Sequence, residues 1–449
     1  MKIIIAGAGE VGSHLAKMLQ NEAHNITVIE NDEQRLGNLS ECADIIPIHG
    51  NPTSIEVLRK ANVNEADLFI AVSPASEQDV NLISALLAKR LGCQRVAARI
   101  NNQEYLKYDN KLMFKESGID LLFYPELLAT SEIYDLLKQS GTTEYTSFSN
   151  GTLQLLVYKL REDAPIVDKK ASELSFYNSE TPYRMLAITR DGETIIPHGD
   201  FMFKENDLVF IMSKKEGIME AASYAGKESV HINNVMIIGG GRIGELLAHK
   251  LEGNTETVKV IEQRRERCDL LSDCLENTLI VKGDGRNIDL LMEEDLHEAD
   301  AFVAVTSNSE ANILACVAAK RAGVSKTIAE VENMEFINLA ESMGVDAVIN
   351  KKLITASRIF KYTISNTIKT IKCLNGSNAE VMEYVANPES EITKRPIKQL
   401  HFPKDAVIGG ITRGGNGIIA HGDLQVKAYD RVVVFALPSA IKHVNRFFV

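Results

Sequence analysis

Two glycine-rich hexapeptides carry the residues best suited to chemistry in this chain. GAGEVG holds Gly7, Gly9 and Gly12, and GGGRIG, 232 residues later, holds Gly239, Gly241 and Gly244. In such a turn the first glycine permits a tight bend, the second lets the backbone approach a pyrophosphate, and the third lets a helix pack closely on a strand. The N–H groups that open the helix then face the phosphates. The two hexapeptides therefore predict two dinucleotide-binding turns.

An acid follows each turn at the same spacing. Glu30 closes the run NITVIE and Glu262 closes TVKVIE, each 18 residues past the last glycine of its turn. A carboxylate at that place accepts hydrogen bonds from the adenosine ribose and repels a 2′-phosphate, so NAD(H) is favoured over NADP(H). Arg264 and Arg265 weaken this preference in the second site because they offset the repulsion. The alternative, that the two acids are merely solvated strand ends, stays open.

The other candidate ligand contacts lie in the same turns and at the ends of neighbouring strands. They are Ala8, Glu10, Val11, Asn51, Ser73, Pro74 and Arg99 in the first half, and Gly240, Arg242, Ile243, Asp284 and Thr306 in the second. The halves differ in charge, because Arg242 stands in place of Glu10, and Glu330 in place of Arg99. Arg242 could clamp a phosphate, which opens the second site to ATP or ADP, and Arg99 could serve the first site. For both arginines the alternative is an exposed surface charge.

Other reactive residue types have simpler interpretations. His198 and His421 occupy a repeated His-Gly-Asp, which predicts a tight turn with glycine at positive φ and aspartate bonded to the local backbone, rather than a catalytic or metal pair. Ser73 and Thr306 lack a visible base that would make them nucleophiles. Six cysteines form no CxxC pair and no Cys/His cluster, which predicts reduced, buried thiols. We therefore expect no catalytic residues and no metal site.

Composition narrows the class of protein. Acidic residues outnumber basic ones 61 to 49, and the net charge of −12 disfavours broad attachment to nucleic acid or anionic lipid. The longest apolar runs are strand-sized, well short of the ~20 residues of a membrane helix. The start of the chain lacks the layout of a signal peptide. A cytosolic protein without direct membrane insertion is expected.

The elements that must hold these residues repeat along the chain. Each turn lies between an apolar strand pattern and a helical pattern. The pattern indicates about six parallel strands in each half, which predicts an α/β fold with two Rossmann-like doubly wound sheets. A small α+β domain follows each sheet. We expect Rossmann-like domains at 1–140 and 229–370 and α+β domains at 141–228 and 371–449. Helices over Pro125–Ser140 and Lys351–Lys369 could bridge lobes or subunits, or could pack on their own sheets.

Taken together, these features resemble one family over essentially the whole chain. The two glycine turns, Glu30 and Glu262, the Ala-Asp-x-Phe-x-Ala-Val-[Ser/Thr] strands ending at Ser73 and Thr306, and the paired His-Gly-Asp segments carry the resemblance. The chain is similar to the TrkA family, the regulatory subunits of Trk-type potassium uptake systems. Members are built from two RCK (KTN) nucleotide-binding lobes, each followed by an RCK C-terminal lobe.

The resemblance implies a function as well as a fold. Family members bind NAD(H) and adenine nucleotides and assemble as a cytosolic ring, a tetramer of two-lobed chains, beneath a membrane-embedded potassium-translocating subunit. It implies a gating subunit, peripheral at the inner face of the cell membrane through its partner. Arg99 fits the family's nucleotide-contacting arginine, whereas Glu330 departs from it.

Two other classes compete with this interpretation. An NAD-dependent oxidoreductase would use the same turns, because a fold does not settle function. It would also need an acid or base placed for hydride transfer, which the sequence does not single out. A redox-sensing transcriptional repressor would need a basic DNA-reading helix, and neither terminus offers one.

Overall fold

The computed structural model describes residues 1–21, 24–40, 45–174, 181–226, 231–360, 368–374, 377 and 379–448. Contacts divide the chain into two compact units. One contains Met1–Ala129 together with the helix α13 (Lys351–Phe360), and the other contains Thr130–Asn350 and the C-terminal part of the chain. Each unit is described separately below.

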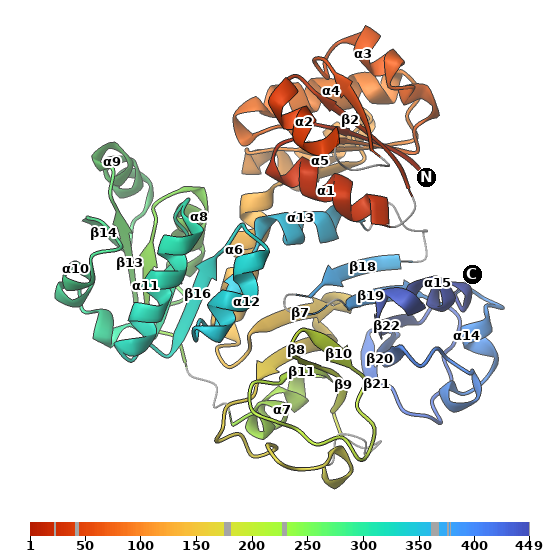
Figure 1. Ribbon diagram of the computed structural model, residues 1–449, viewed down its shortest axis with the longest axis vertical. Coiled ribbons are helices and arrows are strands. Elements are labelled where there is room, and N and C mark those ends of the chain that lie inside the picture. Colours follow the sequence, from red (N-terminus) through yellow and green to blue (C-terminus); the bar gives the residue numbers. More distant parts are fainter. Residues whose placement is uncertain are drawn as a thin grey trace. The chain divides into compact units, whose positions relative to one another are not determined.

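The Rossmann-like lobe of the first unit, coloured red to orange in Figure 1, is a doubly wound parallel sheet. Its strand order is β3-β2-β1-β4-β5-β6. Its strands are β1 (Lys2–Ala6), β2 (Asn25–Glu30), β3 (Ile45–His49), β4 (Leu68–Ala71), β5 (Arg95–Arg99) and β6 (Leu121–Phe123). The helices are α1 (Glu10–Asn21), α2 (Glu33–Ser40), α3 (Ile55–Lys60), α4 (Gln78–Arg90), α5 (Tyr108–Glu116) and the start of α6 (Pro125–Lys138). The strand order reverses between β1 and β4, which run parallel to each other, and this is the switch point where ligands bind in such sheets.

The second unit repeats this sheet with the order β14-β13-β12-β15-β16-β17. The strands are β12 (Asn234–Ile238), β13 (Thr257–Glu262), β14 (Thr278–Lys282), β15 (Ala301–Ala304), β16 (Lys326–Glu330) and β17 (Ala347–Ile349). The helices are α8 (Arg242–Leu251), α9 (Arg265–Cys274), α10 (Ile288–Glu293), α11 (Ser309–Arg321) and α12 (Glu335–Ser342). The predicted duplication of a Rossmann-like lobe is confirmed.

Two small antiparallel sheets complete the second unit, as predicted for α+β modules. One has the order β10-β9-β11-β8-β7 and the other β18-β19-β22-β20-β21. The first contains β7 (Glu144–Phe148), β8 (Leu153–Lys159), β9 (Tyr183–Arg190), β10 (Glu193–Ile195), β11 (Leu208–Ser213) and α7 (Ile218–Tyr224). The second contains β18 (Ile368–Cys373), β19 (Glu380–Val385), β20 (Ala406–Arg413), β21 (Asn416–Ile419), β22 (Arg431–Ala436), α14 (Glu391–Lys394) and α15 (Pro438–Arg446).

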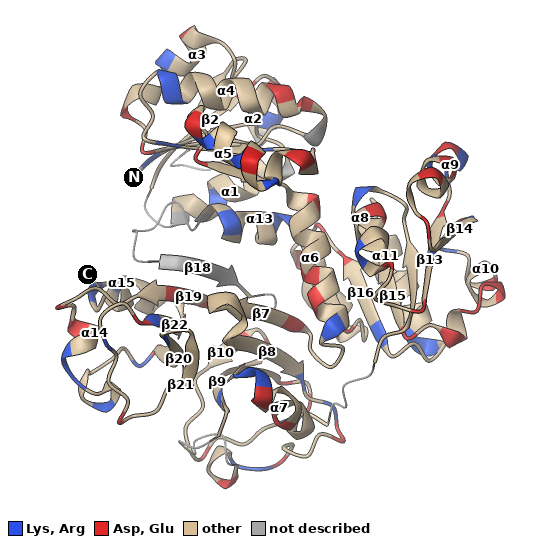
Figure 2. Ribbon diagram, turned by 180° about the vertical axis from the view of Figure 1, so that it is seen from behind, with Lys and Arg blue, Asp and Glu red and all other residues tan. Residues whose placement is uncertain are grey.

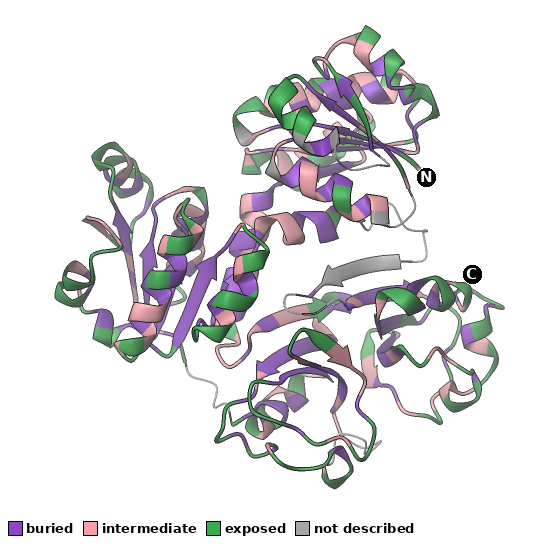
Figure 3. Cartoon of the chain, viewed as in Figure 1, coloured by how far each residue is buried: buried purple, intermediate pink, exposed green. Residues whose placement is uncertain are grey.

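Continuous apolar runs explain the parallel sheets. All four residues of β4 and of β15 are buried, as expected for strands that helices cover on both faces. Figure 3 shows these strands as the buried centre of each lobe, with exposed residues on the outer helices and loops. The two antiparallel sheets share an apolar core in which the Phe210 and Phe435 rings lie 5.5 Å apart.

The two predicted joining helices are divided differently between the two units. The helix α13 follows the second Rossmann-like lobe in sequence but packs against α1 of the first unit. Conversely, α6 follows the first lobe and continues from Thr130 within the second unit, where the Ser131 hydroxyl accepts a hydrogen bond from Lys250 Nζ at 3.2 Å. The helix α13 thus belongs to the unit of the other lobe, whereas the first residues of α6 stay in the unit of their own lobe. The helical prediction through Lys369 was too long, because the β-rich pattern from Ile368 forms β18.

The repeated His-Gly-Asp segments are turns, but not for the predicted reason. The carbonyl of His198 accepts from Phe201 N–H, and that of His421 accepts from Leu424 N–H. Neither glycine has positive φ. Their aspartates pair instead with lysines on other segments, Asp200 with Lys170 and Asp423 with Lys398.

Among the described residues, no helix is long and apolar enough to cross a membrane. Basic and acidic residues are mixed along the helices and loops (Figure 2). Cys93, Cys268 and Cys316 are free, buried thiols, and burial raises the pKa of Cys93 to about 11. The prediction of buried cysteines is wrong for Cys274, which is exposed. Cys42 lies outside the described residues, as does the side chain of Cys373.

Candidate dinucleotide-binding sites

The first glycine of each turn has a backbone conformation that side chains disfavour. Gly7 has φ of 107° and Gly239 has φ of 101°. A Cβ on Gly7 would lie 2.7 Å from the Ser73 nitrogen, and one on Gly239 would lie 2.8 Å from the Val305 carbonyl oxygen. Glycine is therefore required here by the turn itself, where the chain leaves the central strand beside its neighbour.

The third glycine of each turn is required by packing. A Cβ on Gly12 would lie 1.9 Å from the Gly7 carbonyl oxygen, and one on Gly244 would lie 2.1 Å from that of Gly239. Such distances are far inside van der Waals contact. The helices α1 and α8 can therefore approach their turns only without a side chain at these positions.

The second glycine of each turn differs, because the protein itself leaves room for a side chain. A Cβ on Gly9 or Gly241 would meet no atom within 4 Å. The bare backbone at these two positions fits a ligand that lies directly against the turn. The first N–H groups of α1 and α8 follow, and such groups have no partner within a helix. These turns therefore have the open surface and the donors that a pyrophosphate needs.

The strand-end acids are buried and hold the turns. One oxygen of Glu30 accepts from Ala8 N–H at 2.6 Å, and one oxygen of Glu262 accepts from Gly240 N–H at 2.8 Å. The other oxygen of Glu30 accepts from the N–H groups of Asn31 and Asp32. A carboxylate has about four acceptor positions, so these contacts leave capacity for ribose hydroxyls.

Glu262 differs from Glu30 in having an arginine partner. Arg264 donates to one Glu262 oxygen from its backbone N–H at 2.9 Å and from Nε at 3.2 Å. Burial acts to raise the pKa of Glu262, but the hydrogen bonds from Arg264 and Gly240 outweigh it and keep the pKa below its ordinary value. The carboxylate is thus ionised, and Arg264 compensates part of its charge.

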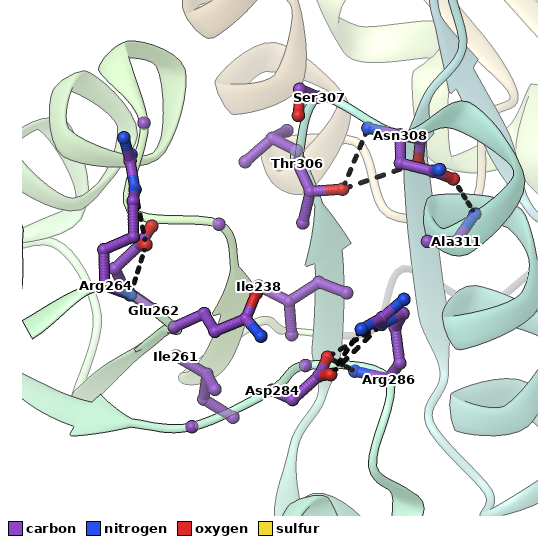
Figure 4. Close-up of a pocket in the computed structure, with 16 residues that line it drawn as sticks. Ile238, Ile261, Glu262, Arg264, Asp284, Arg286, Thr306, Ser307, Asn308 and Ala311 are labelled. Atoms are coloured by element: carbon purple, nitrogen blue, oxygen red, sulfur yellow. Dashed lines mark hydrogen bonds and ion pairs between the residues drawn. The ribbon is translucent and has the colours of Figure 1, made fainter.

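A cavity of about 550 Å³ opens at the carboxyl ends of β12 to β15 in the second lobe (Figure 4). Five of the predicted contacts line it together, namely Gly239, Gly241, Glu262, Asp284 and Thr306. Gly240, Arg242, Ile243 and Gly244 belong to the same turn and helix but are not part of this lining. The site is therefore assembled from four strand ends, as a dinucleotide site at a switch point requires.

Sequence reasoning missed several residues of this cavity, of which Arg286 is the most informative. Gln263, Gly283, Gly285, Arg286, Ser307 and Asn308 also line the space. Arg286 Nη2 donates to Asp284 at 2.7 Å and Nε donates to the same carboxylate at 3.0 Å. The hydrogen bond from Arg286 lowers the pKa of Asp284. A basic residue two positions after a strand-end acid was the available signal, and Thr53 stands there in the first half.

Buried asparagines hold the strand ends at Ser73 and Thr306. Asn81 accepts from Ser73 N–H at 2.8 Å and donates to its carbonyl, and Asn312 forms the same two bonds with Thr306. Thr306 Oγ1 also donates to Asn312 at 2.6 Å. Both hydroxyl residues are thus fixed at the sheet edge by a duplicated clamp.

The remaining predicted contacts lie in or near the first turn, apart from Arg242, which begins α8. Val11 is buried in α1, Glu10 is the first residue of that helix, and Pro74 precedes a short 3-10 helix. Asn51 accepts from Thr53 N–H and hydroxyl in a local turn. Arg242 is half-exposed and pairs with Glu245 at 3.3 Å.

Arg99 is more buried than Arg242 and has an acidic partner. It ends β5 next to the end of β4, at the carboxyl edge of the first sheet. Its Nη2 donates to Glu126 at 2.8 Å. The corresponding strand end of the second lobe, Glu330, is also buried.

Matches to family models follow the same duplication. The TrkA-N domain matches residues 3–125 and 235–351, and the TrkA-C domain matches residues 155–226 and 381–449. The chain belongs to the TrkA family. Its resemblance to that family, predicted from the paired turns and acids, is confirmed over nearly the whole sequence.

Curated relatives match the chain from end to end. The "Trk system potassium uptake protein TrkA homolog 2" of Methanosarcina mazei is 32% identical, and the match covers 100% of both proteins. A TrkA homolog of Archaeoglobus fulgidus is 34% identical with the same coverage. The TrkA protein of Haemophilus influenzae is 32% identical over 97% of this chain and 95% of its own length.

Solved structures share the fold at low sequence identity. The crystal structure of the GsuK RCK domain gives a TM-score of 0.61 with 16% identity and covers 100% of this chain and 94% of its own. The GsuK channel bound to NAD gives 0.60 with 17% identity, covering 100% of this chain and 78% of its own. Among the residues the structure describes, no three His, Cys, Asp or Glu side chains group to hold a metal ion.

Proposed function

We propose that this chain is a nucleotide-binding regulatory subunit of a Trk-type potassium uptake system. It senses NAD(H), ATP or ADP in its two Rossmann-like lobes and controls a membrane-embedded potassium-translocating subunit. The observation that carries the proposal is the pair of complete glycine turns with strand-end acids in one chain of the TrkA family. The relatives are named potassium uptake proteins, which supports the transport context.

In each site, different residues would hold different parts of the nucleotide. Gly9 and Gly241 admit the pyrophosphate to the helix N-termini, and Glu30 and Glu262 accept from ribose hydroxyls. The other predicted contacts, among them Asn51, Asp284 and Thr306, surround the remaining parts of the ligand. A GsuK channel bound to NAD and another bound to ADP, both similar in fold to this chain, fit the expected ligands.

The second lobe carries more positive charge around its site than the first. Arg264 and Arg286 stand where the first half has Asp32 and Thr53, and Arg242 stands where it has Glu10. We propose NAD(H) for the first site and assign ATP or ADP as the alternative occupant of the second. The two sites would then report different aspects of cell metabolism.

The proposed role is gating rather than catalysis. A ligand can shift a conformational equilibrium only by its differential affinity for two states, typically about 1–3 kcal/mol. We propose a homotetramer that works at the cytoplasmic face of the membrane through its partner, without inserting into the bilayer. Its domains would divide near residues 140, 228 and 370, as the sequence predicts.

A flux assay tests this function. Potassium transport by the reconstituted membrane subunit is measured with this protein and with NADH, NAD⁺, ATP or ADP added in turn. The expected result is a flux that depends on both the protein and a nucleotide. Flux that is indifferent to every nucleotide contradicts the proposal, and sustained NADH consumption with a metabolite panel would support the oxidoreductase alternative instead.

A further inference from the structure

Arg99, a predicted ligand contact of the first candidate site, has an acidic partner. Arg99 Nη2 donates to Glu126 Oε1 at 2.8 Å, and only 13% of each side chain is exposed. Charge-assisted hydrogen bonds of this kind are about twice as strong as neutral ones. A nucleotide oxygen that approaches Arg99 must therefore share it with Glu126 or displace Glu126.

Arg99 also has hydrogen-bonding capacity that the protein leaves unused. Its Nε is buried and has no hydrogen-bond partner among the described residues. A guanidinium group has five N–H donors in a fixed plane, and a buried donor without an acceptor destabilises the protein. An acceptor brought in by a ligand would satisfy this group, which favours transfer of Arg99 from Glu126 to the ligand.

Glu126 lies at the start of α6, the helix that begins in the first unit and continues in the second. It is in the first turn of α6, where a negative charge is favourable by itself because of the helix dipole. Helix α6 contributes its residues up to Ala129 to the first unit and continues in the second unit from Thr130. The Arg99–Glu126 pair thus joins the edge of the first candidate site to the beginning of the bridging helix.

The second half lacks this arrangement. The last residue of β16, at the place of Arg99, is Glu330, and the second residue of α13, at the place of Glu126, is Lys352. The second half therefore carries the opposite charge at both positions. The Glu330 carboxylate at this strand end repels a nucleotide phosphate. Because no arginine stands at this position, the second half has no arginine that a competing acid could hold.

We propose that Glu126 is a built-in competitor that sets the nucleotide affinity of the first site by holding Arg99. Binding of NADH, or of another nucleotide that offers an anionic oxygen, moves Arg99 from Glu126 to the ligand. This inference rests on the proposed function, because it requires a nucleotide in the first lobe. It adds a residue outside the glycine turn and the strand-end acid to the determinants of affinity.

Site-specific titration tests the inference. NADH is titrated into the full chain, and protection from hydrogen exchange at residues 7–13 reports occupancy of the first site separately from the second. Glu126→Gln keeps the shape but removes the charge, and the NADH affinity should rise about three- to tenfold. Glu116→Gln, an exposed change on α5, is the matched control and should leave the affinity unchanged.

The arginine completes a double-mutant cycle. Arg99→Gln should weaken NADH binding, and Glu126→Gln should then have no further effect. A merely structural role for Glu126 predicts weaker binding or no change on substitution, so an increase in affinity separates the two roles. Glu126→Asp, which keeps the charge on a shorter side chain, is the reserve variant if Glu126→Gln does not fold, and it should give a smaller increase.

The outcomes distinguish this inference from the proposed function. Protection of the first turn by NADH in the unmodified chain, with unchanged or weaker binding in Glu126→Gln, overturns the inference and leaves the function in place. An equal increase in affinity with and without Arg99 also overturns it. If neither NADH nor ADP protects the first turn in the unmodified chain, the inference is wrong together with nucleotide binding at the first site, and the flux assay decides the function separately.

Discussion

At the scale of single residues, the two strand-end acids have a second task beyond ribose recognition. Glu30 and Glu262 each accept a hydrogen bond from the second residue of the glycine turn and from N–H groups just beyond their own strand. An acid at this place therefore keeps the turn in shape before any ligand binds. Its loss should affect affinity for every nucleotide as well as the choice between NAD(H) and NADP(H).

The glycines can be separated into those the fold needs and those the ligand needs. We expect Gly9→Ala and Gly241→Ala to weaken nucleotide binding at their own lobes at least tenfold with little change in stability, because a methyl group fits the protein but crowds a pyrophosphate. Calorimetric titration with NADH and ADP measures the affinity, and thermal unfolding measures the stability.

Matched controls lie three residues farther along each turn. Gly12→Ala and Gly244→Ala place a methyl group about 2 Å from a carbonyl oxygen, so both should destabilise their lobes strongly. Equal stability losses at the second and third glycines would contradict this division. Unchanged affinity in both Gly9→Ala and Gly241→Ala would argue against nucleotide binding at these turns.

The residue-level predictions from sequence were uneven for a physical reason. Gly7 and Glu30 could be found because a fixed spacing ties them to one strand–turn–helix unit. Arg286 and the clamp by Asn312 could not be assigned, because their roles depend on which strand ends meet at the sheet edge. The sequence placed Arg99 near the site, but its pairing with Glu126 requires the position of α6.

At the scale of elements, the contact between α1 and α13 is the least predictable feature of the fold. Residues Ala356 and Ile359 of α13 are fully buried. The pattern of apolar residues predicted a helix but could not name the surface it covers, because any lobe with an open apolar stripe would serve. The doubly wound parallel class of the two sheets, by contrast, was predicted from the repeated α/β pattern.

His14 makes this helix pair sensitive to pH. Burial, followed by the charges of Lys352 on α13 and Lys17 on α1, lowers its pKa below 6.5, and its buried Nε2 has no hydrogen-bond partner in the part of the chain that the structure describes. The unfolded chain therefore binds the proton more readily than the folded one, and stability is lost as the pH falls below about 6.5. Denaturant unfolding at pH 7.5 and pH 5.5 should show a smaller loss in His14→Gln. Equal losses in both proteins would contradict the assignment.

The small α+β lobes depend on a duplicated ion pair. Asp207 is fully buried and accepts hydrogen bonds from Arg190 Nε at 2.7 Å and Nη2 at 2.8 Å. Asp430 accepts the same two kinds of hydrogen bond from Arg413. Arg190→Met should cost about 3 kcal/mol of unfolding free energy, since it leaves a buried carboxylate without its partner. Chemical denaturation measures this loss. Glu391→Gln, which breaks a pair that is half exposed, is the control and should change stability by less than about 1 kcal/mol.

At the scale of the whole molecule, two similar halves are joined by an exchange of helices. The class of fold, the two parallel sheets and the α+β modules were all predicted from the repeats, because each repeat carries its own period and turn signals. The exchange itself was not resolved from the sequence. The second half supplies α13 to the first unit, and the first half supplies the part of α6 from Thr130 onward to the second unit.

This exchange predicts how a truncated protein behaves. A fragment of residues 1–226 lacks α13, so the surface of α1 that α13 covers would be exposed to water. We expect the fragment to be less stable than the full chain, and we expect residues 231–449 added in trans to restore an equimolar complex. Analytical ultracentrifugation and thermal unfolding measure both effects. A fragment that stays monomeric and as stable as the full chain would contradict the expectation.

The same exchange says something about how such a chain could arise. In a half-length chain with one nucleotide lobe, the helix that covers α1 would come from a second copy if the same packing were kept, so we expect such a chain to form a dimer. Fusion of two such genes turns that borrowed helix into a permanent part of one polypeptide. In a dimer of identical chains, one sequence forms both pockets. After fusion each pocket has its own sequence, so the two pockets are free to diverge.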